Sequence, residues 1–168
     1  AQRRPLAHTR LDELLGAFLD HYGGAIPGES RPYPGVVEAL DRFEAAGFTA
    51  AVCTNKYEGL STALIGALGL SHRFAAICGQ DTFAFRKPDP RHLTETIAKA
   101  GGDPLRAIMV GDSQTDILTA KAAGIPVVAV DFGYTDRHVR EFEPSRIISH
   151  FDELSIDMAE SLIMALQR

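Results

Sequence analysis

Residues 107–130 decide the fold, and they read AIMVGDSQTDILTAKAAGIPVVAV. The pattern predicts a strand over Ala107–Val110, a helix over Thr115–Ala123 and a second strand over Pro126–Val130. Both strands are continuous apolar runs rather than alternating ones, which is typical of parallel strands covered by helices on both faces. The segment therefore predicts a strand–helix–strand unit of a parallel sheet.

The same alternation continues on both sides of this unit. Three more strands are predicted, over Phe48–Cys53, Ala75–Cys78 and Ile147–Ile148. Five more helices are predicted, over Leu11–Tyr22, Val36–Ala46, Glu58–Leu68, Arg91–Ala100 and Phe151–Leu166. The expected fold class is therefore α/β, with a doubly wound parallel sheet.

The composition fits a globular protein and argues against several classes of partner. The chain has 168 residues, of which 45% are hydrophobic and 23% charged, enough for one domain with a sizeable core. A net charge of -5 without a basic stripe argues against nucleic acid as a partner. The apolar runs are too short to cross a membrane, so no membrane association is expected.

Cysteine and histidine usage indicates neither a disulfide nor a metal cluster. Cys53 and Cys78 lie inside predicted strands, so we expect buried free thiols in a protein of the reducing cytoplasm. The six histidines lack the spacing of metal ligands, and each is expected on the solvated surface: His8, His21, His72, His92, His138 and His150.

Polar side chains follow three of the predicted strands. Thr54 and Asn55 come directly after the strand that ends at residue 53, and Lys87 lies in the loop beyond the strand that ends at residue 78. Asp112 follows the strand that ends at residue 110, and Asp116 lies one helical turn later. Ligands bind beyond the carboxyl ends of such strands. Hydroxyl, ammonium and carboxylate groups together suit a phosphate and a magnesium ion.

Three motifs in this order resemble the haloacid dehalogenase superfamily, in the branch of the phosphoglycolate phosphatases. They read VCTNK at residues 52–56, RKPDP at residues 86–90 and MVGDSQTDI at residues 109–117. Flanking stretches resemble the same branch: Tyr33-Pro34-Gly35, Ala122-Ala123-Gly124-Ile125, Phe132-Gly133-Tyr134 and Phe151-Asp152-Glu153-Leu154. The resemblance implies a Rossmann-like core and a magnesium-dependent phosphatase of a small phosphorylated metabolite such as 2-phosphoglycolate.

The resemblance also implies a role for each site residue. Thr54 would hydrogen-bond the phosphoryl group, and Asn55 would help to position it. Lys87 would neutralise the nucleophile and the transferring phosphoryl group. Asp112 would ligate Mg²⁺, and Asp116 would support the site directly or through water.

Simpler interpretations exist for the same residues. Thr54 is also suited to cap the helix that follows it. Lys87 alone reads as a solvated loop lysine. Asp112 and Asp116 also suit the first turn of a helix, where they would stabilise its dipole by about 0.3–1 kcal/mol. Ser113 is expected to contribute through its backbone at most.

One motif of the superfamily does not occur in these 168 residues. The resemblance implies a first strand ending in Asp-x-Asp, which carries the nucleophile that forms an aspartyl-phosphate, and no Asp-x-Asp occurs here. That strand would lie between the strands ending at Cys53 and Val110. Residues 1–30 are then expected to be the remnant of a helical cap and its linker, and residues 31–168 the core domain. We expect such a truncated chain to be inactive alone, or to receive the strand in trans or by self-association.

Other functions compete with the phosphatase. A phosphomutase of the same superfamily shares these motifs, whereas a dehalogenase needs no metal. A non-catalytic phosphate-binding or interaction module is favoured by the lack of Asp-x-Asp and disfavoured by the joint presence of Thr54, Lys87 and Asp112. A receiver-like signalling domain would place its acidic pair before the threonine, and this chain does not.

Overall fold

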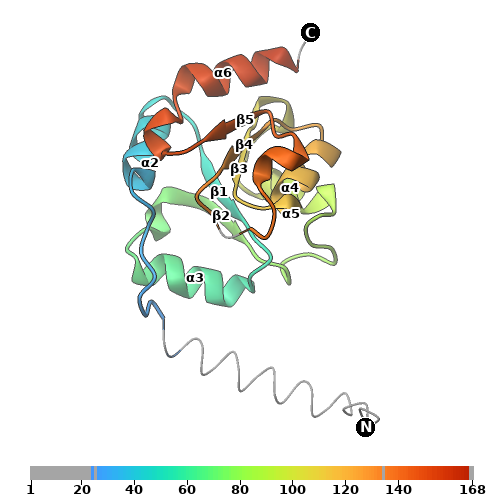
Figure 1. Ribbon diagram of the computed structural model, residues 1–168. Helices are drawn as coiled ribbons and strands as arrows, with labels where there is room; N and C mark the ends of the chain where they lie inside the picture. Colours follow the sequence, from blue (N-terminus) through green and yellow to red (C-terminus); the bar gives the residue numbers. More distant parts are fainter. Residues whose placement is uncertain (1–23, 25, 134, 167–168) are drawn as a thin grey trace.

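The computed structural model describes residues 24, 26–133 and 135–166 (Figure 1). The strands are β1 Ala50–Cys53, β2 Phe74–Cys78, β3 Met109–Gly111, β4 Val127–Val130 and β5 Arg146–Ile148. The helices are α2 Val36–Ala45, α3 Glu58–Ala67, α4 Pro90–Lys99, α5 Gln114–Ala122 and α6 Ile156–Ala165. The predicted helix Leu11–Tyr22 and most of the proposed cap remnant lie outside the described residues.

The strands pair in parallel, as the apolar runs predict. β1 pairs with β2 in a register that sets Cys53 opposite Cys78. β4 pairs with β3 on one side and with β5 on the other. Within the described part of the chain, β1 and β3 do not pair with each other, so the strands form one sheet of two and one of three.

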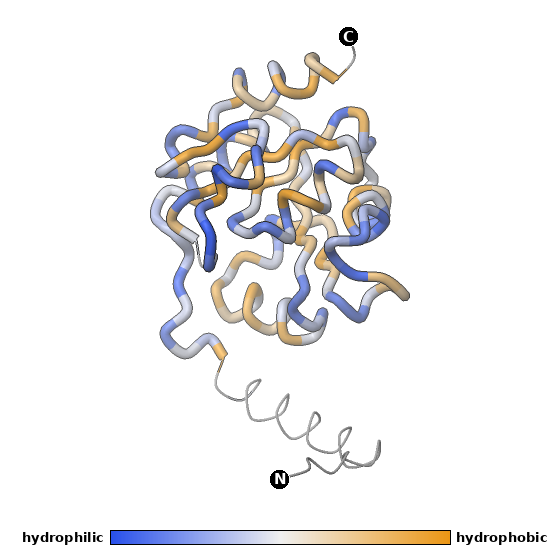
Figure 2. The backbone as a smooth tube through the Cα atoms, turned by 45° about the vertical axis from the view of Figure 1, so that its right-hand side comes forward, coloured by the Kyte–Doolittle hydropathy of each residue, from blue (hydrophilic) through white to orange (hydrophobic). Residues whose placement is uncertain are grey.

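Two apolar clusters cover the two faces of the three-stranded sheet. On one face Val127 and Ala129 pack with α4 and α5, and this cluster reaches the partly buried Cys53 of β1. On the other face Val128 and Val130 pack with residues of α2 and α6. Figure 2 shows that hydrophobic (orange) and hydrophilic (blue) stretches alternate along the chain. Helices on both faces of a parallel sheet confirm the doubly wound α/β prediction.

Strand burial differs between the two sheets. All four residues of β4 are buried, as its continuous apolar run predicts. All four residues of β1 are half-buried, and Val110 of β3 is 38% exposed. The strands that would flank a further strand are therefore less covered than β4, which is paired on both sides.

The closing helix predicted over Phe151–Leu166 is wrong at its start. Phe151–Glu153 forms a separate 3₁₀ turn, and α6 begins after it. The Glu153 carboxylate accepts hydrogen bonds from the backbone of residues 149 and 150, which closes the turn. Ser155 then accepts the N–H of Met158 as the N-cap of α6. Two successive caps split what the apolar spacing presents as one helix.

The fold also shows the state of the two cysteines. Cys53 and Cys78 are free, as expected; Cys78 is buried, but Cys53 is only half-buried, and this burial raises the pKa of its thiol. Among the described residues, no helix is long and apolar enough to cross a membrane.

Candidate active site

The loops that follow β1, β2 and β3 meet at one edge of the molecule. Gln80 N–H donates to the carbonyl of Lys56 at 3.0 Å, which joins the first two loops. A side chain at Gly79 would place its Cβ 2.1 Å from the backbone nitrogen of Glu58, so these loops touch at a position that excludes a larger residue. The predicted polar clusters are therefore brought together, as parallel topology requires.

Lys87 lies at the centre of this edge and is buried. Its Nζ donates to the carbonyl oxygen of Cys53 at 2.8 Å and to Oδ1 of Asp116 at 2.5 Å. The side chain is 9% exposed, so the interpretation as a solvated loop lysine is wrong. The ammonium joins the end of β1 to the first turn of α5 and thereby links the two sheets.

Asp116 is also buried, and its two oxygens have different partners. Oδ1 holds Lys87, while Oδ2 accepts the Ser113 hydroxyl at 2.8 Å and the backbone N–H of Asp112 at 3.2 Å. Burial alone would raise the pKa of Asp116, but the charge and hydrogen bonds of Lys87, with those of Ser113 and Asp112, lower it overall. Asp116 is therefore a carboxylate that organises the turn between β3 and α5.

Ser113 contributes its side chain to this turn, contrary to the expectation of a backbone role. Its hydroxyl accepts the N–H of Asp116, and the Asp116 carboxylate accepts the N–H of Ser113, which makes a capping box for α5. The sequence signal was present, because a serine three residues before an acidic residue at a helix start has this meaning.

Asp112 lies directly after β3 at the same edge. Its side chain packs against Gly133, where a Cβ would approach Oδ2 of Asp112 to 2.5 Å. Asp112 and Asp116 offer the hard oxygen donors that suit Mg²⁺. The described residues hold no cluster of three or more histidine, cysteine or acidic side chains that could bind a metal. Both Asp116 oxygens have protein partners, so the assignment of Asp112 as an Mg²⁺ ligand, with Asp116 in support, stays a prediction.

Thr54 and Asn55 lie in the loop after β1. The Thr54 hydroxyl accepts the N–H of Lys56 at 3.1 Å, and the cap position of α3 is Tyr57, so the interpretation of Thr54 as a helix cap is wrong. Asn55 donates its side-chain amide to the carbonyl of Lys87 at 2.9 Å. Asn55 thus contacts the loop that carries Lys87, whereas the Thr54 hydroxyl bonds within its own loop.

The expectation that His92 lies on the solvated surface is wrong. Its side chain is fully buried on α4, whereas His72, His138 and His150 are exposed as expected, and His8 and His21 lie outside the described residues. Its ring bonds the backbone of Lys87 and of Gly79. No local pattern distinguishes this burial, because the spacing of His92 suits an exposed side of α4 as well as a buried one.

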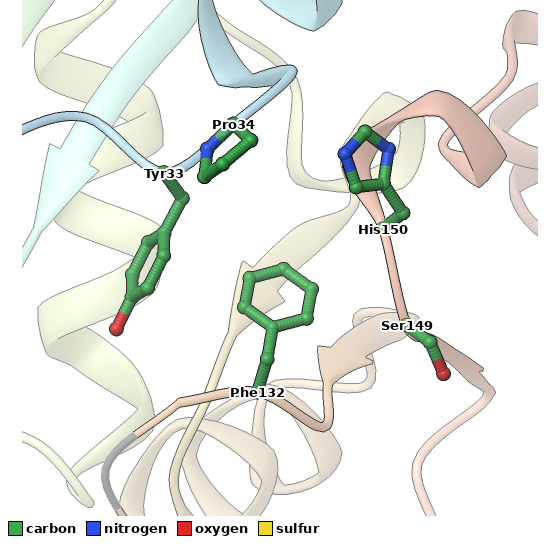
Figure 3. Close-up of a pocket in the computed structure, with 5 residues that line it drawn as sticks. All are labelled: Tyr33, Pro34, Phe132, Ser149 and His150. Atoms are coloured by element: carbon green, nitrogen blue, oxygen red, sulfur yellow. The ribbon is translucent and has the colours of Figure 1, made fainter.

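A pocket of about 240 Å³ opens beyond β4 and β5 (Figure 3). Tyr33, Pro34, Phe132, Ser149 and His150 line it, and the Tyr33 and Phe132 rings meet edge to face with centroids 5.2 Å apart. Phe132 directly precedes Gly133, which packs on Asp112. The pocket therefore lies next to Asp112.

Known proteins and solved structures are similar to this chain over most of its length. A phosphoglycolate phosphatase of Mesorhizobium japonicum is 73% identical over 165 residues, which are 98% of this chain and 73% of that protein. The structure of a predicted phosphoglycolate phosphatase from Haemophilus somnus matches 90% of this chain and 68% of its own, with 30% identity and a TM-score of 0.81.

CbbY from Rhodobacter sphaeroides, solved in complex with phosphate, matches 92% of this chain and 70% of its own, with 25% identity and a TM-score of 0.79. A family model described as haloacid dehalogenase-like hydrolase matches residues 4–130. The chain therefore belongs to the haloacid dehalogenase-like hydrolase family.

Proposed function

We propose that this chain carries the phosphate-binding part of a phosphatase site that acts on a small phosphorylated metabolite such as 2-phosphoglycolate. The observation that carries the proposal is the buried Lys87 ammonium, held at the carboxyl edge between Cys53 and Asp116. A fixed cation in a buried site stabilises charge on a phosphoryl group more strongly than a mobile one in water. The names of the relatives and the phosphate complex of CbbY support the same chemistry.

The remaining site residues have complementary roles in this proposal. The Thr54 hydroxyl accepts the N–H of Lys56, which leaves its own hydrogen to donate to a phosphoryl oxygen. Asn55 acts by holding the Lys87 carbonyl. Asp112 would ligate Mg²⁺, and Asp116 would orient the Asp112 backbone. When bound, the ion would neutralise charge on the phosphoryl oxygens.

The nucleophile is proposed to lie on an Asp-x-Asp segment, which these 168 residues do not contain. Attack by such a carboxylate would form an aspartyl-phosphate, as the family resemblance implies. A phosphate-binding module without catalysis is the second candidate, because the lack of Asp-x-Asp favours it. The two candidates differ in turnover once an Asp-x-Asp strand is supplied.

Phosphate binding and turnover together test this proposal. Binding of inorganic phosphate to the chain, followed by ³¹P NMR, should be lost in Lys87→Met and kept in Lys99→Met, which removes an exposed lysine from the end of α4. A protein extended at its N-terminus by the Asp-x-Asp strand should release phosphate from 2-phosphoglycolate. Equal phosphate binding by both lysine variants would contradict the proposed site, and binding without turnover in the extended protein would favour the non-catalytic module.

A further inference from the structure

A buried histidine lies directly behind the lysine of the proposed site. His92 has no exposed surface, and Phe83 packs edge-on against its ring with centroids 5.7 Å apart. Its Nδ1 accepts the backbone N–H of Lys87 at 3.3 Å, and its Nε2 lies 3.0 Å from the carbonyl oxygen of Gly79. The ring therefore connects the lysine loop to the end of β2.

These two contacts specify one protonation state of the ring. Nδ1 accepts a hydrogen bond only when it carries no hydrogen, so the hydrogen of the neutral ring lies on Nε2 and is donated to Gly79. Burial lowers the pKa of His92, and the charge of Lys87 acts in the same direction. A doubly protonated ring would turn an N–H toward the N–H of Lys87 and lose that contact.

The backbone of Lys87 is consequently held on both sides. His92 accepts its N–H, and Asn55 donates to its carbonyl oxygen at 2.9 Å. Its ammonium, at the far end of the side chain, is held in turn by Cys53 and Asp116. A lysine side chain has four rotatable bonds, so its ammonium is placed reproducibly only if the backbone from which it extends is fixed.

We propose that His92 is a positioning residue that fixes the Lys87 backbone through its bare Nδ1, with Nε2–H anchored on Gly79. The role of the fixed lysine in turnover rests on the proposed phosphatase function, whereas the hydrogen-bonded arrangement does not. His92 itself touches no reacting atom; it acts through Lys87.

Two substitutions test the two ring nitrogens separately, because each keeps only one of the two hydrogen bonds. The side-chain oxygen of His92→Asn takes the place of Nδ1 and keeps the Lys87 contact, whereas the amide nitrogen of His92→Gln takes the place of Nε2 and keeps the Gly79 contact. Hydrogen exchange at the Lys87 amide, measured by NMR on the 168-residue chain, should stay slow in His92→Asn and become fast in His92→Gln. Equal exchange in the two variants would overturn the proposal.

The unmodified chain provides a test that needs no variant. The ¹⁵N shifts of the His92 ring should show a bare Nδ1 and a protonated Nε2 at neutral pH, and the opposite tautomer would overturn the proposal. Thr96→Val is the control for lost buried polarity on the same helix, because the Thr96 hydroxyl bonds the His92 carbonyl and not Lys87. Hydrogen exchange at the Lys87 amide should remain slow in Thr96→Val.

Turnover by the N-terminally extended protein adds the functional outcome. Misplacing a catalytic group by about 1 Å can cost about 10²-fold, so His92→Gln should lower kcat by about tenfold to hundredfold, with a smaller change in KM. His92→Asn should stay within about threefold of the unmodified protein, and a loss equal to that of His92→Gln would overturn the positioning role. If the unmodified extended protein is inactive, the phosphatase proposal fails, and the exchange and tautomer measurements still decide the placement of His92.

Discussion

Lys87 and Asp116 illustrate how burial, rather than distance, sets the importance of an ion pair. Their oxygen and nitrogen are 2.5 Å apart, and both side chains are less than 10% exposed. Arg137 and Glu141 are also 2.5 Å apart, but both side chains are about half exposed. Solvent screens the second pair and not the first, so the two pairs should respond very differently to the loss of one partner.

Removing one partner of each pair tests this difference. Asp116→Asn should lower the free energy of unfolding by about 3–5 kcal/mol, because it leaves the Lys87 charge buried without a counter-charge. Glu141→Gln should change it by about 0–1 kcal/mol, the usual range for an exposed pair. Urea unfolding of both variants measures the two values, and comparable small losses would show that water reaches Lys87 in the native state.

The free energy of unfolding should depend on pH because His92 gains a proton more readily in the unfolded chain than in the folded one. Burial lowers its pKa in the folded chain below the ordinary value of 6.5, so its contribution is complete above pH 6.5 and is lost as the pH falls through the folded pKa. Asp116 has a lowered pKa and an ordinary value of 3.8, and it therefore acts in a more acidic range.

Urea unfolding between pH 7.5 and 5 should show this loss, with a slope of at most about 1.4 kcal/mol per pH unit for one proton. The slope should flatten in His92→Asn and persist in His72→Asn, which changes an exposed histidine. An unchanged slope in His92→Asn would mean that another group titrates in this range.

At the scale of the elements, the loops after β1 and β2 form one unit through Gly79 and Thr82. Gly79 donates its N–H to the Thr82 hydroxyl at 2.8 Å, and that hydroxyl donates to the Glu58 carboxylate at 2.5 Å. The nearest neighbours of a Cβ at Gly79 would be backbone atoms of Glu58 and Lys56. Backbone cannot move aside as a flexible side chain can, so the close approach requires glycine.

Gly79→Ala should therefore destabilise the chain by about 1–3 kcal/mol, the usual scale of overpacking. Gly59→Ala is the matched control, because Gly59 lies in α3 and a Cβ there meets nothing within 4 Å. It should stabilise by about 0.4–1 kcal/mol. Thermal or urea unfolding of the two variants measures their changes in stability, which should have opposite signs. Unchanged stability in Gly79→Ala would show that the two loops separate readily.

At the scale of the whole molecule, the two sheets are joined through helices and without a shared strand pair. Within the described residues β1 and β3 do not pair, while α4 packs on β1 and β2 and against α5, which covers β3 and β4. The Lys87 ammonium adds a polar link across the same boundary. The edges of β1 and β3 are thus the proposed place for a further strand, supplied in trans or by a second copy.

The 168-residue chain assayed alone should show no hydrolysis of 2-phosphoglycolate above a metal-only blank. Phosphoryl transfer to an enzyme carboxylate needs an in-line nucleophile and a proton donor for the leaving oxygen. Asp116 cannot attack, because Lys87 and Ser113 occupy its oxygens, and Asp89 is committed to the start of α4 and to Arg91. Release of inorganic phosphate measures the outcome.

An added peptide of an apolar strand ending in Asp-x-Asp should restore some turnover, and a peptide with both aspartates changed to asparagine should not. Hydrolysis by the chain alone that disappears in Asp112→Asn would reveal a nucleophile among these residues and would contradict the proposal that the nucleophile lies on an Asp-x-Asp strand.

Local pattern determined the class of the fold and the position of most elements. Continuous apolar runs predicted parallel strands, and glycines after the helices predicted their ends; Gly69 and Gly124, for instance, adopt positive φ directly after the C-cap residues of α3 and α5. The same pattern located Thr54 and Asp112 directly after strands and Lys87 in a loop beyond one, at the edge to which parallel strands point their carboxyl ends. These features depend on neighbours in sequence and on topology alone.

The tertiary structure decided which polar side chains are buried and which hydrogen-bond or ion-pair partners they have. The spacing of His92 suits a surface helix as well as a core, and only the packing of α4 against β1, β2 and α5 removes it from water. Asp116 looks like an ordinary acid of a first helical turn until the lysine loop, 29 residues away in sequence, places Nζ on its Oδ1. Such contacts join segments far apart in the chain, and their energies depend on the exclusion of water, which no local sequence pattern encodes.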